Sequence, residues 1–213
     1  MRFSALMMSC EERTPSRELT LNRLRESGWS VEPEVILDDG IGDSKIERIH
    51  RTWRRLIRRG AEQRADFLLL LEDDVVFGRH FSENVASWQL LRELAGRPFY
   101  ASLYNPCHPF LARREQERYL VGDPRFIWGA QALITTPRTA RYIDAHWDSA
   151  PGNPDQRMPL IAARVTPIYF HLPSLVDHAP VPTTWGGIQH TAWDFDPDWR
   201  PGAAGPLAAA DRK

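Results

Sequence analysis

The sequence lacks several segments that would have marked common classes of protein. It contains no GxxxxGK[ST] phosphate loop and no GxSxG segment, which disfavours a P-loop nucleotide hydrolase and a serine hydrolase. A receiver-type signalling domain would carry an acid pair after its first strand, where this chain has Ser9-Cys10-Glu11-Glu12. No run approaches the roughly 20 apolar residues that cross a bilayer. We therefore expect none of these four classes.

Cysteine, lysine and net charge are also scarce. The two cysteines, Cys10 and Cys107, lie far apart and make neither a disulfide framework nor a zinc site, so a reducing cytoplasm is the expected location. Nearly all of the 27 basic residues are arginines, and the net charge is −1. That balance implies no general attraction to nucleic acid or to an acidic membrane. The opening MRFSALMMSC is too short for a signal peptide and is expected to be a strand.

The most informative stretch is DFLLLLEDDVVF, residues 66–77. An unbroken apolar run of this length is typical of a strand buried on both faces of a parallel sheet. It ends abruptly in Glu72, Asp73 and Asp74. Three adjacent acids repel one another unless a cation lies among them, and oxygen ligands of this kind suit Mg²⁺ or Mn²⁺ shared with phosphates. The pattern favours a metal-assisted enzyme acting on a phosphorylated or nucleotide substrate; the alternative is a solvated acidic turn.

Strand and helix patterns alternate along the chain, with chain length typical of one α/β domain. This order implies right-handed crossovers and a mostly parallel, doubly wound sheet with helices on both faces. Residues 105–119 are expected to form a loop. The expected strands are 3–8, 31–37, the apolar run that ends at Glu72, 99–103, 126–135 and 165–171; the expected helices are 14–27, 45–59, 82–95, 137–147 and 155–164.

These patterns resemble the nucleotide-sugar-dependent glycosyltransferases of the GT-A fold. The resemblance covers about residues 1–180, and residues 181–213 are expected to be a Trp-, Pro- and Gly-rich arm with a disordered end. The matching segments are Arg13-Thr14-Pro15, the DDG at 38–40, the EDD at 72–74, the WGAQALITT strand and the VDH at 176–178. The EDD is similar to the family's acidic DxD metal motif, and no particular subfamily follows.

The resemblance implies roles for the acidic residues that follow the strands. Asp74 would ligate Mn²⁺ or Mg²⁺, and Glu72 or Asp73 would contact the ribose or a metal-bound water; Glu72 is also a candidate ligand. Asp38 and Asp39 would contact the nucleotide, although an Asx turn before a glycine explains them too. Arg13 and Thr14 could contact the nucleoside, or could be an exposed arginine and a helix cap.

The late half of the chain supplies candidates for the remaining roles. His178 would complete the metal site, with His171 as a competitor, and either could instead be a turn histidine bonded to backbone. Asp155 is the first candidate for the base that takes the acceptor proton, with an N-cap as its alternative, and Asp123 is the second. Four residues are expected near the donor sugar and acceptor: Trp128, Gly129, Ala130 and Gln131. A tight bend inside the sheet is the alternative explanation for the glycine.

The overall prediction is a glycosyltransferase that moves a sugar from a nucleotide-sugar donor to an acceptor hydroxyl. The acceptor could be a glycan, a small molecule, a lipid-linked group or a modified-DNA hydroxyl. The alternatives are a Mg²⁺-dependent phosphoryl or nucleotidyl transferase, and a non-catalytic nucleotide-sugar or nucleic-acid binding module. The arginines of the helix at 45–59 are expected on a solvated face, with a basic patch for an anionic partner as the alternative. The late aromatics Trp185, Trp193, Phe195 and Trp199 could stack on a ligand or pack across the domain.

Overall fold

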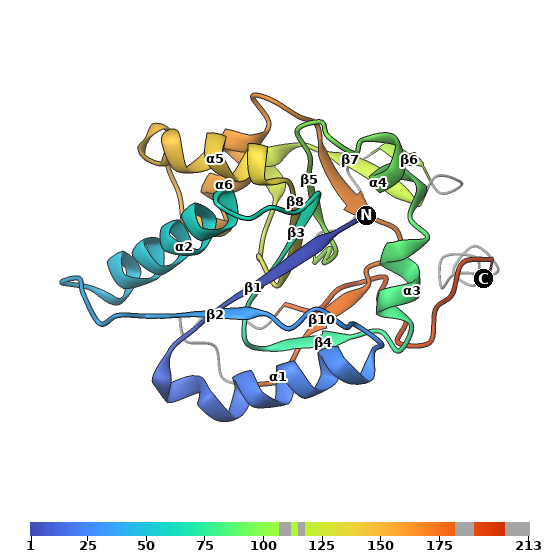
Figure 1. The fold of residues 1–213 in the computed structure, drawn as a ribbon, viewed down its shortest axis with the longest axis horizontal. Coiled ribbons are helices and arrows are strands. Elements are labelled where there is room, and N and C mark those ends of the chain that lie inside the picture. Colours follow the sequence, from blue (N-terminus) through green and yellow to red (C-terminus); the bar gives the residue numbers. More distant parts are fainter. Residues whose placement is uncertain (107–111, 115–117, 182–189, 203–213) are drawn as a thin grey trace.

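A computed structural model describes residues 1–106, 112–114, 118–181 and 190–202. Its main sheet has eight strands in the order β2-β1-β3-β8-β5-β9-β7-β6, and a small two-stranded sheet pairs β10 with β4 (Figure 1). The strands are β1 (Phe3–Ser9), β2 (Glu34–Leu37), β3 (Phe67–Leu71), β4 (Val75–Phe77), β5 (Tyr100–Ser102), β6 (Ala112–Arg114), β7 (Tyr119–Gly122), β8 (Ala132–Thr135), β9 (Ile168–His171) and β10 (Val176–His178).

The helices cover both faces of this sheet, as predicted. Alternate residues of β3 point to opposite faces: Leu69 packs in one core cluster with α1 and α3, whereas Leu68 and Leu70 pack in the other with α2, α5 and α6. The α-helices are α1 (Thr14–Glu26), α2 (Lys45–Ala61), α3 (Phe81–Ala86), α4 (Gln89–Glu93), α5 (Pro137–Ala145) and α6 (Pro154–Ala162). Short 3-10 turns occupy Glu11–Arg13, Pro124–Phe126 and Trp147–Ser149.

The sheet is mostly parallel in strand direction, but β8 departs from a purely parallel order. It lies between β3 and β5 and runs antiparallel to both. On one side β2, β1 and β3 form a parallel group. On the other side β5 and β9 are parallel and β7 is antiparallel to β9. Of the strand expected over 126–135, the structure keeps Ala132–Thr135 as β8, which runs in the opposite direction to both of its neighbours.

Two expected elements are divided differently in the structure. The single helix expected over 82–95 is two short helices, because Trp88 leaves the helical region and buries its whole ring against His171. The loop expected over 105–119 contains β6, which pairs with β7. None of the helices in the described parts of the chain is long and apolar enough to span a bilayer.

The described part of the C-terminal arm, residues 190–202, contains turns but no helix or strand. It packs across the domain: Trp199 is 6% exposed within the core, and its carbonyl accepts a hydrogen bond of 3.1 Å from the Asn84 side chain. Phe195 packs against the same cluster. These aromatics follow the packing alternative rather than ligand stacking, and Trp185 lies outside the described residues.

Candidate functional site

A cavity of about 680 Å³ opens where β1, β2 and β3 end. This volume lies within the range of small-molecule sites, and the carboxyl ends of parallel strands are where open α/β sheets bind ligands. The lining is rich in ionisable side chains. Those from the first half are Glu12, Arg13, Asp38, Lys45, Arg48, Glu72, Asp73 and Asp74; those from the second half are Asp155, His178 and His190.

The acidic segment after β3 is held by two neighbouring strand pairings. The Glu72 amide donates to the Gln131 carbonyl at 3.0 Å, which extends the β3–β8 pairing by one step. The Ala179 amide donates to the Asp74 carbonyl at 2.7 Å, just beyond the pairing of β10 with β4. These two bonds bring Gln131 beside Glu72, and His178 beside Asp74, although the paired residues lie far apart in the sequence. His178 was expected near these acids.

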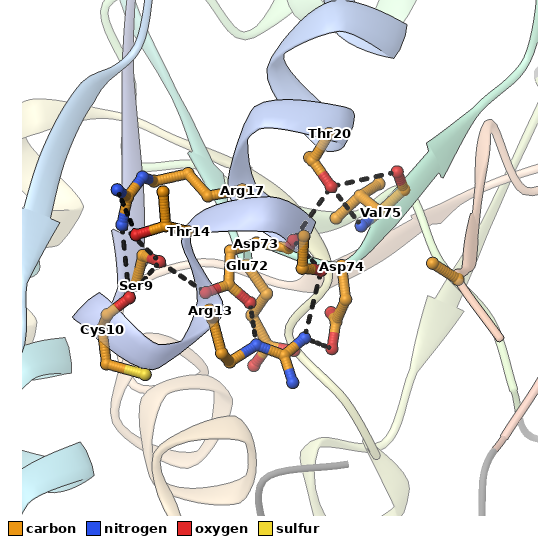
Figure 2. Close-up of polar contacts among 12 residues, drawn as sticks. Ser9, Cys10, Arg13, Thr14, Arg17, Thr20, Glu72, Asp73, Asp74 and Val75 are labelled. Atoms are coloured by element: carbon orange, nitrogen blue, oxygen red, sulfur yellow. Dashed lines mark hydrogen bonds and ion pairs between the residues drawn. The ribbon is translucent and has the colours of Figure 1, made fainter. Parts of the chain in front are cut away.

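Arg13 lies against two of the three acids (Figure 2). Its Nε is 2.6 Å from Asp73 Oδ1, and its terminal nitrogen is 2.6 Å from Asp74 Oδ2. The Ser9 hydroxyl donates to the other Asp73 oxygen at 2.6 Å. All three charged side chains are largely buried, which makes these contacts stronger than surface ion pairs. Arg13 is therefore bonded to the acidic cluster and is not the exposed arginine that the sequence left open.

Thr14 has a different place from Arg13. The N-cap of α1 is Arg13, and the Thr14 hydroxyl donates to the Glu11 carbonyl at 2.7 Å. Thr14 is absent from the described lining of the cavity. The prediction of Thr14 as the helix cap is therefore wrong, because the N-cap is one residue earlier, at Arg13.

The crowding of carboxylates has a clear effect on Glu72. Burial raises its pKa well above the ordinary value, and the charges of Asp74 and Asp155 raise it further. Burial also raises the pKa of Asp73, although its bonds to Ser9 and Arg13 oppose the shift. The cluster thus holds more negative charge than Arg13 neutralises, which favours a proton or a further cation at Glu72.

His178 is oriented toward the acids by its backbone contacts. Its Nδ1 lies 2.7 Å from the Ala179 carbonyl, which leaves Nε2 directed at Asp74, 3.3 Å from Oδ2. The Asp74 contact raises the pKa of His178. A ring held this way is the arrangement that metal-ligating histidines use. By contrast, His171 is fully buried between Trp88 and Trp199, so it does not compete for this role.

The donor set suits a divalent cation. Asp74 is only 6% exposed, and its Oδ1 has no hydrogen-bond partner among the described residues. Carboxylates match Mn²⁺ or Mg²⁺, and Mn²⁺ also accepts a neutral imidazole. No three His, Cys, Asp or Glu side chains of the described ranges form a ready-made metal site. An ion here would therefore share its coordination with ligand oxygens or water, as Mg²⁺ sites usually do.

Asp38 and Asp39 follow β2 and behave differently. Asp38 lines the cavity and accepts from Arg48 Nε at 2.9 Å and from the Gly40 amide at 2.9 Å. Burial alone would raise the pKa of Asp38, but these bonds outweigh it and hold the pKa below its ordinary value. Asp39 pairs with Arg51 at 3.0 Å and does not line the cavity. Of the two, only Asp38 is placed to meet a ligand there, and its bond to the Gly40 amide also has the Asx form.

Asp155 lines the same cavity from a later part of the chain. It lies in the first turn of α6, where Asn153 is the N-cap, so Asp155 is not the cap that the sequence left open. Its Oδ2 accepts from the Gly129 amide at 3.0 Å. Gly129 has φ +85°, and a Cβ there would lie 2.3 Å from Gln131 Oε1, so this turn requires glycine.

The remaining candidates are divided between the cavity and its surroundings. Gln131 lines the cavity, and its amide nitrogen donates to Glu72 at 3.2 Å. Ala130 is buried in the core and absent from the lining. Asp123 caps a 3-10 turn and pairs with Arg125, away from the described lining.

Internal ion pairs occupy the arginines of α2. All six contact acids of the same chain, which offsets part of the positive charge of this helix. The pairs are Arg48–Asp38, Arg51–Asp39, Arg54–Asp144, Arg55–Asp39, Arg58–Asp144 and Arg59–Glu34. Arg48, which the helical pattern assigned to a solvated face, also lines the cavity.

Sequence reasoning missed several residues of the site. Ser9 is the last residue of β1, and its position at a strand end is a signal that could have identified it. Arg48 and Lys45 lie in the first turns of the helix that follows Asp38, which was a weaker signal. Tyr104 and His190 reach the cavity through long-range packing that no local pattern reveals.

No protein-family model matches the sequence, and no curated protein matches it. Among solved structures, the chain is similar to a glycosyltransferase involved in the glycosylation of the major capsid of PBCV-1, with a TM-score of 0.52 and 11% identity over 80% of this chain and 81% of that one. It also matches A197 from STIV, with a TM-score of 0.40 and 13% identity over 84% and 85%. A third match is a CMP:2-keto-3-deoxy-manno-octonic acid synthetase complexed with CTP, with a TM-score of 0.42 and 9% identity over 80% and 89%. Only the first score exceeds 0.5, and at that identity the likeness shows the fold alone: this chain has a GT-A-like α/β fold.

Proposed function

We propose that this protein is a glycosyltransferase that moves a sugar from a nucleotide-sugar donor to an acceptor hydroxyl. One observation carries the proposal: carboxylates from three separate places in the chain, Asp38, Asp74 and Asp155, line one cavity at the ends of the parallel strands. The GT-A-like fold agrees with it.

The residues divide into three tasks in this proposal. Asp38, with Arg48 beside it, would contact the nucleoside at the end of β2, and Arg13 would contribute positive charge near the diphosphate. Asp74 would be the first ligand of Mn²⁺ or Mg²⁺, with Glu72 and His178 as the neighbouring candidates, and oxygens of the donor or water would complete the coordination. A divalent ion there supplies Lewis-acid stabilisation of the negative charge on the departing diphosphate.

Asp155 is the proposed base. The acceptor oxygen forms a bond to the anomeric carbon while the bond from that carbon to the diphosphate oxygen breaks. The diphosphate takes the electron pair, and Asp155 takes the proton of the acceptor hydroxyl. The bond from the Gly129 amide fixes one oxygen of Asp155 and so orients the carboxylate within the cavity.

The test is donor turnover with product identification. A panel of UDP, GDP, CMP and dTDP sugars is incubated with the protein and Mn²⁺, with Asp74→Asn as the matched variant. The proposal predicts slow donor hydrolysis that releases free sugar and is lost in Asp74→Asn. Release of pyrophosphate from a nucleoside triphosphate and a sugar phosphate would indicate a nucleotidyltransferase instead. Binding of a donor without turnover in the presence of diverse acceptors would contradict an enzyme.

A further inference from the structure

The contact between Arg13 and the acidic cluster has a geometry that bears on how a metal would bind. One guanidinium bridges two neighbouring carboxylates, at 2.6 Å to Asp73 and 2.6 Å to Asp74 (Figure 2). Its side chain is 14% exposed. The backbone position is also fixed, since the Arg13 amide donates to the Cys10 carbonyl at 3.2 Å at the junction of the 3-10 turn with α1. The positive charge of Arg13 is therefore built into the wall of the cavity.

The same cluster has an oxygen that Arg13 does not satisfy. Asp74 Oδ2 takes the contacts to Arg13 and to His178, whereas Oδ1 is buried and has no partner among the described residues. The geometry thus leaves a second, unsatisfied oxygen for a cation on a carboxylate that already bears one.

Two cations on one carboxylate repel each other. A divalent ion at Asp74 Oδ1 would lie within a few ångströms of the guanidinium on Oδ2, at a distance where like charges in a poorly hydrated wall interact strongly. The diphosphate of a donor is an anion that can lie between the two cations and offset this repulsion. Free metal and Arg13 are therefore in competition for the charge of Asp74, and the diphosphate relieves that competition.

We propose that Arg13 is a resident counter-cation that keeps the affinity of the acidic cluster for free divalent ions low, so that metal enters together with the diphosphate of the donor. This inference deepens the proposed function and rests on it for the identity of the anion. Arg13 is a positioning residue here, because it acts on the metal through Asp73 and Asp74.

The experiment measures Mn²⁺ binding to the full chain without nucleotide, by the loss of the free-ion electron paramagnetic resonance signal. Arg13→Gln removes the charge and keeps a hydrogen-bonding side chain, whereas Arg13→Lys keeps the charge. We expect Arg13→Gln to bind Mn²⁺ at least about tenfold more tightly than the wild type, and Arg13→Lys to stay close to the wild type. Arg25→Gln, in the helix α1 that follows Arg13 and paired with Glu32, is the matched control and should leave Mn²⁺ affinity unchanged.

Equal Mn²⁺ affinities for the wild type and Arg13→Gln, or no Mn²⁺ bound by either, would overturn the inference. Because Arg13→Gln can lose stability, each variant is also melted with and without Mn²⁺. A larger Mn²⁺-induced rise in melting temperature for Arg13→Gln than for the wild type supports the inference, and an equal rise overturns it. Donor hydrolysis by the wild type is measured separately, so a failure of the proposed function and a failure of this inference give different results.

Discussion

The carboxylates that line the cavity fall into two groups that differ in what they contact. In the arginine-paired group, Asp38, Asp73 and Asp74 each contact a guanidinium of Arg48 or Arg13. In the amide-bonded group, Glu72 accepts from the Gln131 side-chain amide and Asp155 accepts from the Gly129 backbone amide. Among the described residues, neither Glu72 nor Asp155 forms an ion pair with an arginine, lysine or histidine.

The contrast is clearest between Asp38 and Glu72. The bonds of Asp38 to Arg48 and to the Gly40 amide hold its pKa below the ordinary value, which suits a residue that positions a nucleotide as an ionised carboxylate. Glu72 has no arginine partner among the described residues, and burial together with the nearby acids raises its pKa, so its charge calls for a cation. Asp73 lies between these cases, because burial raises its pKa despite the Arg13 contact.

The largest expected effect is on the rate of sugar transfer and concerns Asp155, in the amide-bonded group. Asp155→Asn keeps an oxygen that can accept from the Gly129 amide but removes the proton acceptor. We expect sugar transfer to fall by about 10²–10⁴-fold, the usual contribution of a general base, while donor binding changes little. Steady-state transfer rates and donor titrations check this. Transfer at the wild-type rate would remove Asp155 from the mechanism.

The next largest effect is on the free energy of unfolding and concerns Arg13, which pairs with two members of the arginine-paired group. Arg13→Ala leaves Asp73 and Asp74 buried without their cation, and breaking a buried pair in this way costs about 3–5 kcal/mol. Urea unfolding at neutral pH measures the change. Arg25→Ala, at an exposed pair with Glu32, is the control and should alter stability far less. Equal losses for the two variants would show that the Arg13 pairs contribute no more than a surface contact.

A smaller effect is expected where backbone geometry supports Asp155. Gly129→Ala places a Cβ against Gln131 at a positive φ, so we expect a loss of about 1–3 kcal/mol in stability and a fall in transfer rate. Gly96→Ala has a similar φ of +79° with open space around the added carbon, and it serves as the control. Gly96→Ala should lose some stability but no activity. Matching activities for the two variants would separate the Gly129 turn from the function of Asp155.

The smallest expected effects are on stability, and they have opposite signs for Glu72 and Asp38. The raised pKa of Glu72 means that the folded state binds its proton more tightly than the unfolded chain, so this group lowers stability as pH rises above the ordinary value of 4.5. Glu72→Gln should therefore stabilise the protein at pH 7 by about 1 kcal/mol, and the gain should vanish below pH 4.5. Urea unfolding at both pH values measures it. A loss of stability at pH 7 would contradict the charge crowding.

Asp38→Asn gives the opposite expectation. The lowered pKa of Asp38 contributes stability above its ordinary value of 3.8, and that stability is lost as pH falls through the folded-state pKa. Removal of the charge should cost about 0.5–1 kcal/mol at pH 7, because Arg48 is partly exposed and its contact is screened. The same unfolding series checks it. An unchanged midpoint at pH 7 would mean that Arg48 finds another partner.

The order of strands and helices could be predicted from the sequence because apolar periodicity is a local property. The apolar run of β3 and the helical spacing of α2 identify themselves without knowledge of their neighbours. The position of the acids after β3 could be predicted for the same reason, since a fully buried strand fixes where its last residues emerge, and they stay a candidate site. The cavity then gathers Asp38 and His178 as the topology implied.

The partners of these acids could not be predicted in the same way. Arg13 meets Asp73 across 60 residues, and Gly129 meets Asp155 across 26. Such contacts depend on which strands are neighbours, and β8 joins the sheet antiparallel between β3 and β5, which no local pattern shows. Arg48 is an example. Its position in the helical pattern predicted a solvent-exposed side chain, whereas the fold places it beside Asp38 at the cavity.

The most direct test of the central claim is calorimetric titration of UDP, GDP, CDP and dTDP into the wild type and Asp74→Asn, with and without Mn²⁺. We expect at least one diphosphate to bind the wild type much more tightly when Mn²⁺ is present, and Asp74→Asn to abolish this metal-dependent gain. Binding that is independent of Mn²⁺ and unaffected by Asp74→Asn, or no binding of any diphosphate, would contradict it.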